Sequence, residues 1–431
     1  MTTVTEPHRL WRNTRYLTWL VSDTSKGLAG ALSNFAIPLL ALIVTNDPAQ
    51  AGIIGGAGMV ARLLMTLAGG IFADRHRRIA LMLLGSLIGI VLAGGFTILA
   101  LGDALTFGTL LVADVLIAAR SGLFDVAGES AIKEIVPDDA MGRAQAANQG
   151  RDAALQLAGG PLGGFLLGVG GWLVGVAMTV CHAVAAVTAW MLGRQTRRAG
   201  VIDTGAAEDD ATEDAAKPNA WAELREGFGW LLSRPDLGGV LLITTIINLG
   251  FNAAITTVIY ALQQAGYSEL LIGTLSASLG AVMLVGAVFA PLLVPRIRAG
   301  ILMIAGLSVA TVGAIALSMV TDPWSIGAVL GACVLLLPAL NASMMGYFMV
   351  ATPTHLLGRA NSAAGVLGMG AMPLAPLIAG FGLAWIGREW TILFCAALCL
   401  VAVVLAVTNR ALRALPVESR WAAHARQYEA A

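Results

Sequence analysis

Charged residues are scarce in this sequence, and the shortage excludes a soluble domain. Asp, Glu, Lys and Arg make up 12% of the 431 residues, whereas a soluble domain uses about 25% to cover its surface. Lys plus Arg and Asp plus Glu number 26 each, so the net charge is zero and gives no sign of a nucleic-acid partner.

Cysteine is also rare, and its placement argues against disulfides and zinc. All four cysteines fall inside apolar stretches, where neither kind of site is expected. They are Cys181, Cys333, Cys395 and Cys399. The sequence contains no visible nucleophile–histidine–acid set, metal-ligand cluster or phosphate-binding loop. We therefore predict neither an enzyme nor a bound cofactor or metal, and we interpret His182 as a satisfied core histidine.

Long apolar stretches dominate instead. Hydrophobic residues make up 57% of the chain and the mean hydropathy is +0.79. Stretches of about 20 residues match the length of a helix that crosses ~30 Å of hydrocarbon, and the 51 glycines permit close helix packing in a membrane. The fold class predicted is an all-α membrane protein of twelve spans. They lie near 16–44, 50–72, 79–101, 106–126, 144–168, 172–192, 237–262, 270–294, 300–320, 324–348, 360–385 and 390–409.

The loops on the two sides of these spans differ in charge. One set holds most of the Lys and Arg, whereas the opposite set holds acids and only Arg388. Lys and Arg are enriched on the cytoplasmic side, so both termini are predicted to be cytoplasmic and the protein to be a multi-pass protein of the plasma (inner) membrane. The basic N-terminus and the long first apolar stretch argue against a cleavable signal peptide.

Two internal echoes indicate two homologous halves. Gly142-Arg143-Ala144 recurs 216 residues later as Gly358-Arg359-Ala360, and Arg75-His76-Arg77 recurs 221 residues later as Arg296-Ile297-Arg298. The prediction is a pair of pseudo-symmetric six-helix bundles, typical of a carrier that rocks between two states. The bundles occupy 1–192 and 236–431, the latter with a cytoplasmic tail. Residues 193–235 form a cytoplasmic linker with an amphipathic helix near 221–234.

Ionisable residues inside the predicted spans are concentrated in the first half. A charge in the bilayer costs several kcal/mol unless it is paired or hydrated. The first span carries a polar stripe that includes Asp23, Lys26 and Asn34, while Arg62 lies near the middle of the second. The fourth span holds Asp114 at mid-depth and Arg120 lower down, with Asp125 near its cytoplasmic end.

We expect Asp23, Arg62 and Asp114 to line one central cavity. An aspartate there is a candidate proton carrier, because burial and a nearby arginine shift its pKa in opposite directions. Asp23, Asp114, Arg62 and Arg120 are therefore the candidate proton-coupling residues. The alternative is that Asp23 with Lys26, and Arg62 with Asp114, are structural ion pairs.

The second half offers amides in place of charges. Asn248 and Asn252 lie one helical turn apart in the seventh span, and Asn341 lies in the tenth beside methionines and aromatic residues. Such a wall suits an amphipathic organic ligand, although these side chains also suit plain helix packing. With Lys26 and Asn34, these amides are the candidate substrate-binding residues.

The loop after the second span carries the most specific motif. Gly70, Ala73, Asp74, Arg75 and Arg78 resemble the loop between the second and third spans of the major facilitator superfamily, and the chain looks closest to its bacterial drug, macrolide and siderophore efflux branch. The resemblance implies a gate in which Asp74 caps the eleventh helix near Arg359. Arg75 or Arg78 would then reach Asp125 or Glu129.

Two departures from the family's patterns affect the antiport assignment. The fifth-span sequence Gly159-Gly160-Pro161 has its proline one position late, and Arg120 is followed by Phe124 where the family's coupling arginine is followed by Gly. The direction of transport therefore depends on the branch resemblance.

Together these features predict a monomeric carrier that exports small organic or amphipathic compounds by alternating access, coupled to proton entry. Its partners are a small-molecule substrate, protons and the lipid bilayer. One alternative is a transporter of lysophospholipid or other lipid-like substrates without strict proton coupling. A more distant alternative is a transport-inactive membrane sensor.

Overall fold

A computed structural model describes residues 12–198, 220–353 and 356–428. Nearly all of these residues are helical, and they contain no strand. Ten helical segments are long and apolar enough to cross a membrane. The all-helical membrane class is thus confirmed, while twelve crossings and cytoplasmic termini stay predictions.

The chain divides into two compact units. Unit 1 comprises Met1–Asp214 and Gly266–Ala277, and unit 2 comprises Ala215–Ala265 and Ser278–Ala431. The division therefore falls within α9, whose first turns belong to unit 1. The sequence predicts a linker at 193–235, and residues 199–219 of that linker lie outside the described residues.

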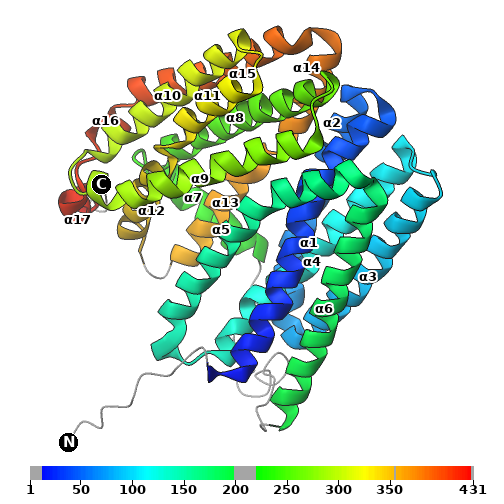
Figure 1. The fold of residues 1–431 in the computed structure, drawn as a ribbon. Coiled ribbons are helices and arrows are strands. Elements are labelled where there is room, and N and C mark those ends of the chain that lie inside the picture. The colour runs from blue at the N-terminus through cyan, green and yellow to red at the C-terminus, as the bar shows by residue number, and fades with distance from the viewer. Residues whose placement is uncertain (1–11, 199–219, 354–355, 429–431) are drawn as a thin grey trace, which may run out of the picture. The chain divides into compact units, whose positions relative to one another are not determined.

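Unit 1 contains six long helices and the start of α9 (Glu269–Leu293). The six are α1 (Thr14–Thr45), α2 (Pro48–Arg75), α3 (Arg78–Leu101), α4 (Phe107–Ile135), α5 (Asp138–Val169) and α6 (Gly171–Arg198). In Figure 1, α1 lies beside α5 and α6, α3 beside α6, and α2 beside α4. Helix starts are encoded locally, since Asp47 and Thr106 accept hydrogen bonds from the first amides of α2 and α4.

Glycines let α2 and α4 approach at backbone distance. A Cβ on Gly69 would meet the backbone of Gly122 and Leu123, and a Cβ on Gly122 would meet the backbone of Arg62. Close approach through small residues is how membrane helices gain packing contacts where no hydrophobic effect drives them together. This pair of helices therefore forms a rigid base for the charged residues of α4.

Unit 2 is built from shorter pieces. They are α7 (Ala220–Ser233), α8 (Gly238–Gln264), the rest of α9, α10 (Ala299–Met319), α11 (Pro323–Val334), α12 (Leu337–Ala351), α13 (Leu357–Gly370), α14 (Leu374–Trp385) and α15 (Gly387–Thr408). Helix α15 packs against α8 and α10 (Figure 1). Helix α7 occupies nearly all of the stretch 221–234 that the sequence predicts as an amphipathic helix, and it buries Leu231 and leaves Leu232 67% exposed.

Two predicted spans of unit 2 are interrupted. The tenth divides into α11 and α12, with Pro338 at the start of the second piece, and the eleventh divides into α13 and α14, with Pro373 capping the second. Proline has no N–H and its ring clashes with the carbonyl of the preceding turn, so it kinks or breaks a helix. Each pair still counts as one candidate span by length and composition.

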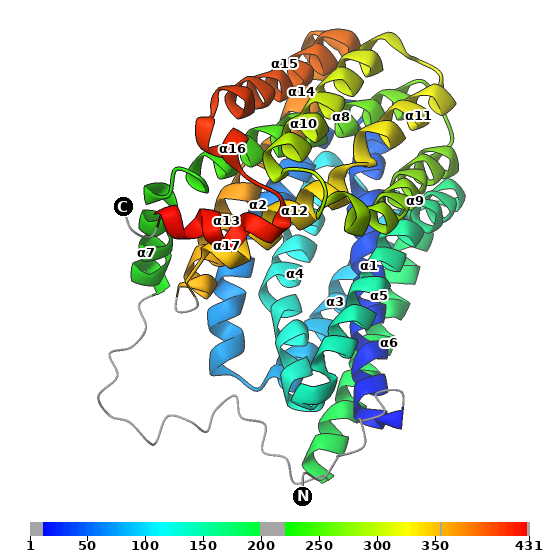
Figure 2. The ribbon, with the colours of Figure 1, turned by 90° about the vertical axis from the view of Figure 1, so that its left-hand side faces the viewer.

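The described chain ends in a folded segment, which we call the C-terminal segment. It consists of α16 (Arg410–Ala414), η2 (Glu418–Arg420), α17 (Trp421–Ala425) and η3 (Arg426–Tyr428). Figure 2 shows α17 beside α12, and α16 contacts α10 and α15. The sequence predicted only a cytoplasmic tail here.

Candidate functional site: an ion network in unit 1

A buried carboxylate of α1 forms the centre of the site. One oxygen of Asp23 lies 2.8 Å from the Lys26 amine and the other lies 2.8 Å from the Arg151 guanidinium. Asp23 is 5% exposed, so water contributes little to its solvation. Two cations therefore balance one carboxylate between α1 and α5.

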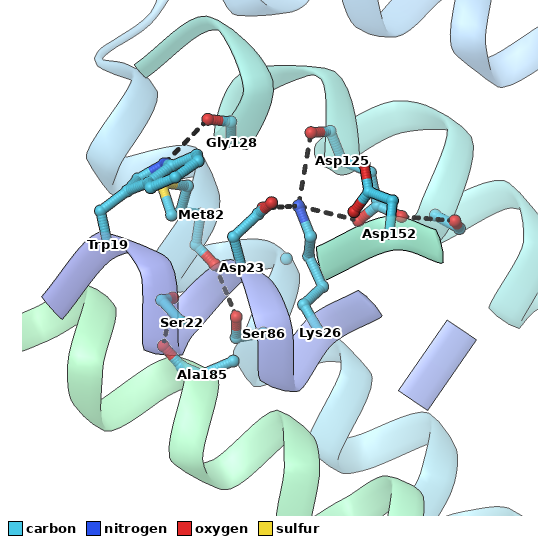
Figure 3. Close-up of polar contacts among 12 residues, drawn as sticks. Trp19, Ser22, Asp23, Lys26, Met82, Ser86, Asp125, Gly128, Asp152 and Ala185 are labelled. Carbon is cyan, nitrogen blue, oxygen red and sulfur yellow. Dashed lines mark hydrogen bonds and ion pairs between the residues drawn. The ribbon is translucent and has the colours of Figure 1, made fainter. Parts of the chain in front are cut away.

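The network continues into α4 through Lys26. Its amine lies 3.6 Å from a carboxylate oxygen of Asp125, and Figure 3 shows it between Asp23 and Asp125. Asp125 also pairs with Arg120 at 3.4 Å and accepts a hydrogen bond from the Ser121 hydroxyl at 2.5 Å. Arg120 also donates to the carbonyl of Gly85 on α3 at 3.2 Å. The network thus joins α1, α3, α4 and α5.

A single glycine leaves room for this network. A Cβ on Gly128 would lie 2.7 Å from an oxygen of Asp23 and 2.8 Å from the Lys26 amine. The carbonyl of Gly128 accepts a hydrogen bond from the Trp19 indole at 3.0 Å, and the Arg151 guanidinium lies 5.7 Å from the Trp19 ring centre. Trp19 therefore fixes the position of α1 against α4 and orients Arg151 toward Asp23.

Asp114 lies outside this ion network, and its sharing of one cavity with Asp23 and Arg62 stays a prediction. Eleven residues separate Asp114 from Asp125 on α4, or about 16 Å along the helix. A Cβ on Gly58 would meet the Asp114 carboxylate, which therefore lies against α2. Within the described part of the chain, Asp114 has no hydrogen bond or ion pair. Arg62 is exposed one turn after Gly58.

At the foot of α4, an ion pair differs from the one the family resemblance implied. Arg78 pairs with Glu134 at 2.9 Å, whereas Asp125 belongs to the network above and Glu129 and Arg75 are exposed. The acid that Arg78 reaches is thus one turn further along α4 than Glu129.

Of the remaining gating residues, Gly70 faces open space at the position of a Cβ. Asp74 lies on α2, but its side chain is outside what the structure describes, so its expected capping role stays a prediction. Arg359 pairs with Glu226 of α7 at 2.6 Å. Arg359 therefore ties α7 to α13 within unit 2.

The predicted substrate-binding residues have mixed surroundings. Asn248 and Asn252 are half-buried on one face of α8, and the Asn252 amide donates to the Asn248 carbonyl at 2.8 Å. Asn34 and Asn341 are exposed. Lys26 belongs to the ion network. Their role in binding substrate stays a prediction.

Sequence reasoning missed two features of the site. Arg151 was visible as a charge in the fifth span, but its pairing with Asp23 is a tertiary contact that no local spacing encodes. His182 is 3% exposed, as expected of a core histidine, but among the described residues its buried Nδ1 has no hydrogen-bond partner. A Cβ on Gly89 of α3 would meet the His182 ring.

Comparison with known proteins identifies the family. The Major Facilitator Superfamily model matches residues 24–376. The enterobactin exporters EntS of Salmonella choleraesuis (strain SC-B67) and Citrobacter koseri (strain ATCC BAA-895 / CDC 4225-83 / SGSC4696) are 28% identical over 403 and 408 residues, which cover 86% of this chain and 89% of theirs.

Solved structures share the fold. A bacterial homologue of the iron transporter ferroportin, in an inward-facing state, has a TM-score of 0.70 at 14% identity, over 90% of this chain and 97% of that one. A bacterial homologue of the human lysosomal transporter Spinster has a TM-score of 0.63 at 16% identity, over 97% and 98%. The chain therefore belongs to the major facilitator superfamily, as its basic loop predicted, and is a multi-pass transporter of the inner membrane.

Proposed function

We propose that this transporter exports a small amphipathic organic compound by alternating access, and that proton entry through unit 1 drives the export. Relatives that cover most of the chain are exporters of a siderophore, enterobactin. A siderophore-like compound is therefore the first substrate to test.

The proposal of proton coupling rests on the contrast between Asp114 and the other buried or half-buried carboxylates of unit 1. Asp23, Asp125 and Glu134 each have a cation within 4 Å, whereas Asp114 has no such partner among the described residues. A carboxyl group without a counter-charge in a low-dielectric setting favours its neutral form, and access to water or a cation favours the charged form. A carrier that changes the surroundings of Asp114 thereby loads and releases a proton.

Asp23 is a weaker candidate for the proton carrier than Asp114. Both of its oxygens are paired, with Lys26 and Arg151. Breaking these pairs leaves buried charges uncompensated, which costs several kcal/mol. We assign the ion network to holding α1, α4 and α5 together, and Asp114 to carrying the proton.

For the substrate, we propose a wall in unit 2 around Asn248 and Asn252. Their amides offer a few hydrogen bonds beside the apolar side chains of α8. Such a wall binds an aromatic or amphipathic compound better than a sugar, which needs many paired polar groups to replace its hydration.

The direct test uses purified protein in liposomes with an imposed pH gradient. The probes are a catecholate siderophore and a lipophilic cationic dye, and a fluorescent lysophospholipid measured without a gradient tests the lipid alternative. We expect gradient-dependent movement of the siderophore or the dye, its loss in Asp114→Asn, and no change in Asp103→Asn, whose carboxylate is exposed. Full gradient-driven transport by Asp114→Asn would reject Asp114 as the carrier. Lysophospholipid movement alone would reject the substrate class.

A further inference from the structure

A second buried ion pair lies at the joint between α7 and α8 in unit 2. Arg234 donates two hydrogen bonds of 2.9 Å to the two oxygens of Asp236, which is fully buried. The Arg234 guanidinium also donates to the carbonyl of Ala351 at the end of α12, at 3.3 Å. The joint is therefore tied to α12 through its charged pair.

Tyr347 connects the same pair to the middle of α12. Its hydroxyl donates to Asp236 at 2.5 Å, so the carboxylate has three donors from two side chains. Burial raises the pKa of Asp236, but the hydrogen bonds from Arg234 and Tyr347 outweigh it and hold that pKa below its usual range. The carboxylate stays charged, and both of its oxygens already accept hydrogen bonds.

The C-terminal segment covers this cluster with aromatic side chains. The Trp421 ring packs edge-on against Tyr347, with ring centres 6.4 Å apart, and fills the space above Gly346. The Trp421 indole donates to the Pro416 carbonyl at 3.1 Å, which fixes the turn into α17. At the far end of the segment, Arg234 lies 5.5 Å from the Tyr428 ring centre.

His424 lies between these two contacts. Its ring centre is 6.0 Å from that of Tyr347 and 5.5 Å from that of Tyr428, and its Nε2 is buried without a hydrogen-bond partner. The charged groups that act on it are Asp236, whose oxygens are already occupied, and Arg234, which repels a second cation. Among the described residues, a proton on the His424 Nε2 has no hydrogen-bond acceptor.

We propose that residues 410–428 form a pH-sensitive clamp, which holds the α7–α8 joint against α12 while His424 is neutral and detaches when His424 is protonated. Trp421 anchors the clamp, and Tyr428 covers Arg234. The clamp secures α7, the helix within the predicted linker at 193–235. Detachment uncovers the buried Arg234–Asp236 pair and loosens α7.

The sign of the pH effect follows from linkage. Burial lowers the pKa of His424 in the docked state, with a smaller opposing influence from Asp236. In the detached segment the pKa returns to about 6.5, the ordinary value for histidine. Docking is therefore complete above about pH 6.5 and weakens as the pH falls from there to the docked pKa, by at most about tenfold per pH unit. Protonation of Asp236 would act only in a lower pH range.

Thiol accessibility measures detachment in the full-length protein in lipid nanodiscs. Ala425 is 2% exposed and Ala422 is exposed, so Ala425→Cys reports docking and Ala422→Cys gives the reference rate at each pH. The parent protein supplies the background from the four native cysteines. We expect the ratio of the two rates to rise about three- to tenfold between pH 7.5 and pH 5.5.

Two further variants make the result decisive. His424→Gln should keep the ratio low and constant with pH, because it cannot be protonated. Trp421→Ala should give a high ratio at both pH values, because it removes the anchor. A ratio that does not change with pH in the parent background, or an equal rise in His424→Gln, would overturn the role of His424. A low ratio in Trp421→Ala would overturn the clamp itself.

Discussion

Asp23 and Arg151 lie on different helices, yet their side chains meet at 2.8 Å in the interior of unit 1. Neither charge reaches bulk water, since the side chains are 6% and 14% exposed. The pair therefore joins α1 to α5, although Asp23 also pairs with Lys26 and Arg151 also pairs with Asp152.

Replacing Arg151 with Gln should destabilise the protein strongly. Removing one partner of a buried ion pair costs about 3–5 kcal/mol, and we expect the lower end because Lys26 still pairs with Asp23. Chemical denaturation in detergent measures the loss. Asp152 also pairs with Arg151, at 2.8 Å, but its side chain is 53% exposed. Asp152→Asn, the comparison variant, should therefore change the stability by less than about 1 kcal/mol. The double variant Asp23→Asn with Arg151→Gln should be more stable than Arg151→Gln alone, because it also removes the uncompensated carboxylate. If it is not, loss of the Asp23–Arg151 ion pair is not what destabilises Arg151→Gln.

A methyl group at Gly122 should disrupt the contact between α2 and α4. Its Cβ would meet the backbone of Arg62, which cannot move aside as a flexible side chain can, and overpacking costs about 1–3 kcal/mol. Gly95→Ala in α3 is the matched control, because a Cβ there meets nothing within 4 Å. Alanine favours a helix over glycine by about 1 kcal/mol. In thermal unfolding, the melting temperature of Gly122→Ala should therefore be lower than that of the parent, and the melting temperature of Gly95→Ala should be equal to it or higher.

Gly58→Ala tests the position of Asp114 without changing its charge. The new Cβ would meet the carboxylate of Asp114, so the side chain must rotate away from α2. We expect gradient-driven transport in liposomes to fall at least severalfold while the protein still folds, with Gly94→Ala as a control that has open space. Unchanged transport in Gly58→Ala would show that the contact between Asp114 and α2 has no role in coupling.

Tyr347→Phe should weaken the joint between α7 and α8. It removes the hydroxyl that donates to Asp236, and a hydrogen bond to a charged group contributes about 1.5–3 kcal/mol. Tyr267→Phe is the control, since Tyr267 has no hydrogen bond among the described residues. Denaturation at neutral pH compares Tyr347→Phe with Tyr267→Phe. Equal stability of the two variants would contradict the hydrogen bond between Tyr347 and Asp236.

The same cluster predicts an acid limit to stability. The pKa of Asp236 is held below its usual value, so its contribution is complete above about pH 4, the value for an unfolded aspartate, and is lost as the pH falls through the lowered pKa. Asp236→Asn should be less stable than the parent at pH 7, and the difference should shrink below about pH 4. A difference that is constant from pH 7 to pH 3 would contradict this.

The sequence predicted the parts of the fold that the membrane dictates. Apolar length follows from the thickness of the hydrocarbon, which is why the stretches near 79–101 and 390–409 coincide with α3 and α15. The basic loop at Asp74 identified the family because its placement after the second span is specific. Helix spacing also brought Asp23 and Lys26 together as a pair.

Contacts between segments that lie far apart in the chain could not be predicted from the sequence. Nothing near Arg151 indicates that it faces Asp23, and nothing near Asp114 indicates that Gly58 receives it. The C-terminal segment has too few apolar residues for its sequence to predict a packed structure. Trp421 packs against Tyr347 and Gly346, which lie far earlier in the chain, so its burial could not be predicted from the residues around it.

The interruption between α11 and α12 has a mechanical consequence. An unbroken helix resists bending along its whole length, because every turn is held by hydrogen bonds. Pro338 has no N–H and therefore lacks one of those hydrogen bonds. The angle between α11 and α12 can therefore change at a smaller cost in free energy. Part of unit 2 can thus swivel at Leu335 and Leu336, a freedom that the continuous α3 of unit 1 does not have.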